Sequence, residues 1–288
     1  MVAKKRQRVL SRGRPPVAHK PERMSSKRSR TIIREHHQLE KERAVALKKG
    51  DIQLANNIKR TINKNGGIAG YQAASKQGQS KDRGGDSSKL LVEWLQQARI
   101  LKSEFLINKQ GSPYSLLEIG ALSTKNAISQ FPKSIKVTRI DLNSQGEGIE
   151  QQDFMQRPLP TSDDGRFDLI SLSLVVNFVP DAVQRGEMLK RVAHFLKNTT
   201  GPVESDHTIL PALFFVLPLP CVTNSRYMDE DLFVRIMRNL GYIVSNSKKT
   251  SKLCYYLFKL AAQSNGMKTE KRLIKDRPRM NNFCIIVE

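Results

Sequence analysis

The chain of 288 residues is long enough for one large α/β domain with an extension. Its formal net charge of +22 exceeds what solubility requires and indicates a polyanionic partner, nucleic acid rather than a membrane surface. The longest apolar stretch, residues 209–221, is too short to span a bilayer, and the amino-terminal residues lack the apolar segment of a secretory signal. We therefore expect neither a membrane protein nor a secreted one.

Much of the positive charge lies in residues 1–30, which contain 11 lysines and arginines and one acidic residue, Glu22. The segment has few apolar residues and its prolines interrupt any helix, so it has little surface to bury on folding. We predict that residues 1–32 form a disordered basic tail, which binds RNA electrostatically and directs the protein to the nucleus and nucleolus. A tail that only adds solubility is the alternative.

Residues 33–110 are predicted to form a helical extension and a linker. Apolar residues recur at helical spacing over 33–63 and are interrupted at Gly50, which predicts a helical hairpin. Residues 75–88 are polar and rich in glycine, which is typical of a flexible linker. The helix that follows carries Trp94 on its apolar face, where we expect a core side chain rather than a base-stacking platform.

The remaining residues, 111–288, alternate between strands and helices, which predicts a mostly parallel, Rossmann-like α/β sheet. Strands are expected at 115–119, 135–142, 167–172, 212–217, 242–245, 253–260 and 283–287. Helices are expected at about 124–131 and after the capping residues Asp181 and Asp229. The basic loop 265–280 joins the last two strands, which predicts an antiparallel hairpin at the sheet edge.

The first of these strands ends in Glu118-Ile119-Gly120, and Asp141 lies near the end of the second. Glycine alone lacks the Cβ that would block a ligand at such a turn. A carboxylate about 20 residues later is suited to bind the two hydroxyls of a ribose. The combination predicts a nucleoside-containing cofactor at the carboxyl edge of the sheet. The turn has one glycine and not the three of a dinucleotide fingerprint, so an ordinary turn with a solvated aspartate is the alternative.

Two further polar groups follow along the chain: Asp153-Phe154 near the expected third strand, and a polar strip after the fourth. This order resembles that of the class I S-adenosylmethionine-dependent methyltransferases. The resemblance implies a cofactor site made of Gly120, Glu118, Asp141, Asp153 and Phe154. In it the glycine lies under the methionine part, Asp141 takes the ribose hydroxyls, and Asp153 and Phe154 flank the adenine. An ordinary surface turn is the alternative for the last two residues.

Five segments are more specific and resemble the fungal nucleolar 25S ribosomal RNA adenine-N1 methyltransferases. They are residues 116–123, 139–143, 152–155, 167–180 and 217–227. The resemblance implies S-adenosyl-L-methionine as the cofactor and methyl transfer to N1 of one adenine during ribosome biogenesis. It also implies large-subunit ribosomal RNA or pre-ribosomal particles as partners, and we expect a monomer. Ala121 and Leu122 depart from the general methyltransferase pattern, because many relatives repeat glycine there.

No acid–base pair is evident at this edge of the sheet, and the implied reaction hardly needs one. N1 of an unpaired, neutral adenine carries a free lone pair, so catalysis rests on alignment and on a site that accepts positive charge. A base in a duplex must first be flipped out. Asn177, after the fourth strand, is the first candidate for binding the target base, and Ser173 is the second. A structural role for Asn177 within its loop is the alternative.

Neither a metal site nor a disulfide is expected. Cys221, Cys254 and Cys284 are far apart and lie in apolar runs, which predicts buried free thiols in a reducing compartment. The chain has no CxxC pair and no histidine at zinc spacing, and the neighbouring His36 and His37 are expected on different sides of a helix.

Two other functions are alternatives. One is a non-catalytic S-adenosylmethionine sensor that binds a protein partner, which the resemblance to animal relatives of this family implies. The other is a methyltransferase that acts on a small molecule. The basic tail and the basic loop 265–280 favour the RNA methyltransferase, because neither alternative needs such charge.

Overall fold

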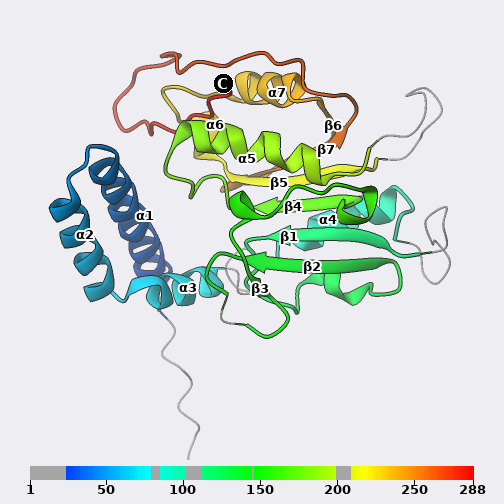
Figure 1. Ribbon diagram of the computed structural model, residues 1–288, viewed down its shortest axis with the longest axis horizontal. Helices are drawn as coiled ribbons and strands as arrows, with labels where there is room; N and C mark the ends of the chain where they lie inside the picture. The colour runs from blue at the N-terminus through cyan, green and yellow to red at the C-terminus, as the bar shows by residue number, and fades with distance from the viewer. Residues whose placement is uncertain (1–23, 79–84, 102–111, 145, 199–208) are drawn as a thin grey trace, which may run out of the picture.

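The computed structural model describes residues 24–78, 85–101, 112–144, 146–198 and 209–288. Most of the predicted tail, residues 1–23, lies outside these ranges. Within them the chain forms an amino-terminal group of helices and a sheet with helices on both faces (Figure 1). No helix in the described ranges is long and apolar enough to cross a membrane.

The amino-terminal extension consists of α1 (Ser26–Lys48), α2 (Ile52–Lys64) and α3 (Gly67–Gly78). The predicted helical hairpin is present, with its turn at Gly50, where φ is +75°. The side chain of Asp51 caps α2 by accepting a hydrogen bond from the N–H of Leu54. The hairpin has a small core of its own, made of Ala46, Ala55, Ile58 and Ile62.

Two boundaries of this region differ from the predicted ones. The hydroxyl of Ser25 accepts a hydrogen bond from the N–H of Arg28, so α1 begins within the segment predicted as tail. α3 continues into the segment predicted as linker and ends at Gly78. Helical structure therefore extends further in both directions than the apolar pattern of residues 33–63 indicates.

The sheet contains β1 (Tyr114–Ile119), β2 (Ile135–Asp141), β3 (Glu150–Gln151), β4 (Leu169–Ser173), β5 (Ala212–Pro218), β6 (Tyr242–Lys249) and β7 (Leu253–Leu260). Its order is β3-β2-β1-β4-β5-β7-β6, and β7 is antiparallel to both of its neighbours while the other pairs are parallel. The chain order reverses between β1 and β4, and open α/β sheets bind ligands at the carboxyl ends of strands at such a switch point. The predicted fold class is confirmed.

Helices cover both faces of the sheet. α4 (Ser88–Gln97) covers one face, and α5 (Ala182–Phe195) and α7 (Glu230–Asn239) cover the other. The neighbouring residues Leu116 and Leu117 belong to the cores on opposite faces, as the alternation of a strand requires. Trp94 is a core side chain, as predicted: it is 6% exposed and makes an edge contact with Phe214.

The antiparallel edge is formed by different segments from those predicted. β6 and β7 pair with each other across a short turn, and residues 283–287 form no strand of the sheet. These residues are buried nevertheless, because their backbone packs against α5, where Ile286 N–H donates to Ala182 C=O. A Cβ on Gly186 would lie 1.9 Å from Ile286 O, so the glycine allows this close approach.

The helix expected at 124–131 is a single 3-10 turn, η1 (Ala127–Gln130). Two further 3-10 turns, η2 (Phe154–Gln156) and η3 (Asp163–Gly165), precede β4, and the short helix α6 (Pro220–Thr223) follows β5. β1 therefore connects to β2 mainly through irregular backbone. That connection depends on side-chain hydrogen bonds from elsewhere in the chain, which belong to the site.

Candidate functional site

Gly120 leaves β1 in a conformation that favours glycine, with φ +75°. Its N–H donates to Ile140 C=O at 2.9 Å, which joins the ends of β1 and β2. A Cβ at this position would lie 2.6 Å from Cγ2 of Val175, in the loop after β4. The turn is thus closely packed between β2 and the β4 loop, and only glycine fits without a shift. The sequence predicted this turn correctly.

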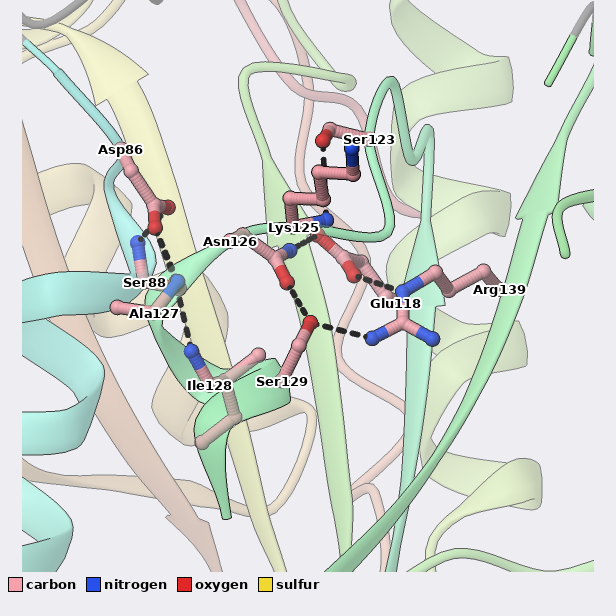
Figure 2. Close-up of polar contacts among 10 residues, drawn as sticks. All are labelled: Asp86, Ser88, Glu118, Ser123, Lys125, Asn126, Ala127, Ile128, Ser129 and Arg139. Carbon is pink, nitrogen blue, oxygen red and sulfur yellow. Dashed lines mark hydrogen bonds and ion pairs between the residues drawn. The ribbon is translucent and has the colours of Figure 1, made fainter. Parts of the chain in front are cut away.

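Glu118, two residues earlier, lies in a network that Figure 2 shows. Its Oε1 accepts a hydrogen bond from Asn126 Nδ2 at 2.6 Å. Arg139 Nε lies 3.4 Å from Oε2, an ion pair without hydrogen-bond geometry, and Arg139 Nη2 donates to Ser129 Oγ at 2.6 Å. Burial raises the pKa of Glu118, while Asn126 and Arg139 act in the opposite direction. The carboxylate therefore anchors the loop after β1, and its direct contact with a cofactor stays a prediction.

The segment before α4 holds the other side of this loop. The Asp86 carboxylate accepts hydrogen bonds from the backbone N–H of Ser88 and of Ala127. Ser88 Oγ donates to Asp86 at 2.9 Å and accepts from the N–H of Ile128 at 3.2 Å (Figure 2). These contacts supply the acceptors for the first N–H groups of η1. They were not predicted, because nothing in the local sequence shows that Asp86 meets Ala127.

Asp141 ends β2 with its carboxylate only partly engaged. Oδ1 accepts a hydrogen bond from Asn143 N–H at 2.9 Å and lies 3.5 Å from Gln72 Nε2 of α3. Within the described residues, Oδ2 has no hydrogen-bond partner. Gln72 Nε2 also donates to Asn143 C=O at 2.5 Å, so the extension contacts the turn that follows the aspartate. Asp141 is named in the sequence analysis but its neighbour Gln72 is not, and the binding of a ribose by Asp141 stays a prediction.

Asp153 and Phe154 lie next to Asp141, since Gln152 N–H donates to Asp141 C=O at 2.9 Å. Asp153 Oδ1 accepts from Met155 N–H at 2.8 Å and caps η2. The Phe154 ring is 3% exposed and packs against Phe195 of α5, with ring centroids 5.2 Å apart. In this structure Phe154 is a core side chain, and its contact with a cofactor adenine stays a prediction.

These strand ends fit S-adenosylmethionine. The turn at Gly120 offers backbone without a side chain, and Asp141 offers an unused carboxylate oxygen beside a strand end. A ribose has two hydroxyl donors, and a short carboxylate matches them. The residues present are therefore compatible with the cofactor.

The loop after β4 carries the two residues predicted to meet the target base. Ser173 Oγ lies 2.9 Å from Ser87 Oγ, in a hydrogen bond that either hydroxyl can donate. Leu174 has φ +57°, a left-handed conformation that is rare for such a side chain. Asn177 Oδ1 is buried and has no hydrogen-bond partner among the described residues. The strained backbone and the unpaired amide oxygen are typical of a functional loop.

Arg185 of α5 is hydrogen-bonded to the backbone of this loop. Its guanidinium donates to Val179 C=O at 2.9 Å, to Pro180 C=O at 3.1 Å and to Cys284 C=O at 2.6 Å. It also lies over the Phe283 ring, 4.8 Å from the centroid. One buried side chain thus connects the β4 loop to the segment 283–287. The sequence reasoning missed Arg185, because a single arginine on a helix carries no pattern.

The helical extension also contacts this loop. His37 stacks on Phe178 with centroids 4.0 Å apart, and Lys48 pairs with Asp181, the residue that caps α5. His36 stacks on Tyr71 at 4.7 Å, and His37 makes an edge contact with the same ring at 5.0 Å. The expectation that the two histidines lie on different sides of their helix is therefore wrong, since Tyr71 of α3 reaches both.

The cysteines are the buried free thiols that the sequence analysis predicts. All three cysteines are free and buried, and burial raises the pKa of Cys221 to about 12 and that of Cys254 to about 11. Among the described residues, no group of three or more histidine, cysteine or acidic side chains is placed to hold a metal ion.

Comparisons with known proteins agree on one family. The family model described as 25S rRNA (adenine(2142)-N(1))-methyltransferase, Bmt2, matches residues 56–285. The chain is 41% identical over 235 residues to the 25S rRNA (adenine(2142)-N(1))-methyltransferase of Saccharomyces cerevisiae, covering 81% of this chain and 63% of that protein. It is 36% identical over 256 residues to the 25S rRNA adenine-N(1) methyltransferase of Schizosaccharomyces pombe, covering 88% and 89%.

Solved structures show weaker likeness. An O-methyltransferase family protein from Burkholderia thailandensis has a TM-score of 0.43 at 12% identity, with 82% of this chain and 72% of that chain covered. The match to the Saccharomyces cerevisiae protein spans less than two thirds of that protein's length, whereas the match to the Schizosaccharomyces pombe protein spans most of its length. From the family match and the identity to these two relatives, the chain belongs to the 25S ribosomal RNA adenine-N1 methyltransferase family.

Proposed function

We propose that this protein transfers a methyl group from S-adenosylmethionine to N1 of one adenine in large-subunit ribosomal RNA. The observation that supports this most directly is the family match over residues 56–285, which includes both strand ends of the cofactor site. Gly120 and Asp141 lie on adjacent strands, joined by the hydrogen bond between Gly120 N–H and Ile140 C=O. Two relatives that are 41% and 36% identical carry this activity in their names.

The residues of the chain act mainly by binding and alignment. Asp141 accepts hydrogen bonds from the ribose hydroxyls, and the turn at Gly120 lets the methionine part approach the backbone. The cofactor, when bound, supplies a methyl group that is already activated as part of a sulfonium. N1 of a neutral adenine attacks without losing a proton, so no general base is required. What the protein must provide is the position of the base relative to the methyl group.

The loop after β4 is the part that positions the base. It leaves the sheet beside β1, because Ile119 pairs with Leu172 in the register of β1 and β4. Asn177 offers a buried amide oxygen and Ser173 a hydroxyl. An amide oxygen that accepts from the amino group of adenine leaves N1 free for attack.

We also propose the binding partner of the protein, its location in the cell and the division of the chain into parts. The net charge of +22 supports binding to RNA within pre-ribosomal particles in the nucleolus. Residues 265–280 add to this basic surface, since most of them are exposed and six are lysine or arginine. We propose a monomer with three parts: a basic tail that ends before α1 begins at Ser26, the helical extension and linker up to residue 110, and the methyltransferase domain 111–288.

Nucleoside mass spectrometry of large-subunit RNA tests the function. Cells without the protein are expected to lose N1-methyladenosine at one position, and the wild-type gene to restore it. Asp141→Ala should fail to restore it, while Asp164→Ala, which removes an exposed carboxylate of η3, should succeed. Persistence of the mark in cells without the protein would contradict the substrate. Cofactor binding by the purified protein with no change in RNA would favour the sensor.

A further inference from the structure

Four aromatic rings meet where the extension touches the β4 loop. His37 of α1 stacks on Phe178, with centroids 4.0 Å apart and an angle of 14° between the rings. Tyr71 of α3 meets both of these rings edge-on and stacks on His36. Phe178 directly follows Asn177 in the loop. An aromatic face therefore lies one residue from the amide that we assign to the target base.

The same interface contains buried polar atoms without partners. Within the described residues, His37 Nε2, Gln72 Oε1 and Asn177 Oδ1 are inaccessible to solvent and make no hydrogen bond. Native proteins rarely bury such atoms unpaired, and a cluster of them calls for a ligand or a second arrangement. Burial lowers the pKa of His37 to about 3, an effect to which His36 and Lys41 add, so its imidazole is neutral.

The distance between the His37 and Phe178 rings decides whether a base can enter between them or must replace His37. Rings 4.0 Å apart are already in contact, so a base cannot enter between His37 and Phe178 as they stand. A base can stack on the face of Phe178 that His37 occupies only if His37 leaves it. The extension has its own core of Ala46, Ala55, Ile58 and Ile62, which includes no residue of the sheet or its helices. α1, which carries His37, can therefore shift together with α2 without opening the core of the catalytic domain.

We propose that Phe178 is the stacking platform for the target adenine, and that His37 covers this platform until RNA replaces it. The proposal rests on the proposed function and extends it to the residues that receive the base. When the adenine lies on Phe178, its amino group is within the reach of an adjacent amide, and Asn177 Oδ1 gains the donor that it lacks. The neutral imidazole of His37 is a flat heterocycle of similar character, which explains why it fits the same face.

Opposite effects of two substitutions test this proposal. The substrate is large-subunit RNA from cells that lack the protein, with labelled S-adenosylmethionine. Phe178→Leu removes a stacking face and is expected to lower kcat/KM by about 5- to 160-fold, the range for one base stacked on an aromatic ring. His37→Ala removes the competitor and is expected to lower KM for RNA, with kcat unchanged. Phe178→Tyr, which keeps the ring, should retain activity.

Controls separate stacking from damage to the fold. His194→Ala, in the last turn of α5, should behave as wild type. Calorimetry with S-adenosylmethionine should give wild-type affinity for all four variants. A Phe178→Leu variant with wild-type kcat/KM, or a His37→Ala variant with a raised KM, would overturn the proposal. If wild type itself leaves the RNA unmethylated, the proposed function fails.

Stacking of an adenine on Phe178 can also be observed directly, without measuring methyl transfer. Adenosine monophosphate is titrated into the protein with saturating S-adenosylhomocysteine, so that the cofactor site is closed to the probe. Nuclear magnetic resonance should show shifts of the His37 ring protons and of the adenine protons in wild type. Phe178→Leu should abolish the adenine shifts, whereas His194→Ala should keep them. Adenine shifts that persist in Phe178→Leu would place the base elsewhere and overturn the proposal even in an active enzyme.

Discussion

A methyl group added at Gly120 should destabilise the protein through two separable effects. Gly120 and Gly266 have similar left-handed conformations, with φ +75° and +70°. Alanine in this region costs about 1–2 kcal/mol at either position. At Gly120 the new Cβ would also lie 2.6 Å from Val175 Cγ2, whereas nothing lies within 4 Å at Gly266. Overpacking of this kind costs about 1–3 kcal/mol more.

We therefore expect Gly120→Ala to lower the free energy of unfolding by about 2–5 kcal/mol, and Gly266→Ala by about 1–2 kcal/mol. Urea denaturation measures both values. The double variant Gly120→Ala/Val175→Ala should show a favourable coupling, because it removes the methyl group that the new Cβ meets. Equal losses in the two single variants would refute the steric argument. Calorimetry should show weaker cofactor binding in Gly120→Ala but not in Gly266→Ala. Wild-type affinity for the cofactor in Gly120→Ala would contradict the placement of the site.

Further predictions concern the loop, the tail and the thiols. Arg185→Met should destabilise the protein by about 3–5 kcal/mol, measured by urea denaturation, because three carbonyl groups lose a charged donor; a loss below about 1 kcal/mol would contradict this role. Gly186→Ala should release the segment 283–287 from α5, seen as faster hydrogen exchange there, and unchanged protection would refute the packing argument. Deleting residues 1–23, which keeps the Ser25 cap, should reduce the slope of log K against log salt for RNA by about 0.7–0.9 for each phosphate that the tail neutralises, and an unchanged slope would leave the tail as an address only. The cysteines should resist a thiol reagent at pH 8 until the protein unfolds, because they are buried and burial raises the pKa of each thiol; rapid reaction of native protein would contradict this.

The parts of the site that follow strand ends could be predicted from sequence. A buried strand followed by glycine, and a later strand ending in aspartate, are local patterns. The parallel sheet brings them together because consecutive strands β1 and β2 are neighbours. The predicted positions of Gly120 and Asp141 at adjacent strand ends follow from this rule alone.

The remaining features depend on contacts between distant residues. Residues 124–131 lack a full helix because Asp86 and Ser88 fix η1 through its backbone. The segment 283–287 is apolar like a strand, yet it is buried against α5 because Gly186 leaves room for its backbone. The sequence around His37 does not show that its ring stacks on Phe178. That contact depends on how the extension packs against the β4 loop.

The hydrogen bond from Arg185 to Cys284 links the β4 loop to a segment that is synthesised much later. Arg185 and Cys284 are 99 positions apart in the sequence. Lys48 and Asp181, which also form a contact across the molecule, are 133 positions apart. A nascent chain that has completed β1, β2 and β4 has formed the strand ends that carry Gly120 and Asp141, but Cys284, which accepts a hydrogen bond from Arg185, has not yet been synthesised. Fragments that end before Cys284 are then expected to keep the ends of β1 and β2 but to lack one of the contacts that hold Arg185 beside the β4 loop. The β4 loop is in this way fully anchored only after residue 284 has been synthesised.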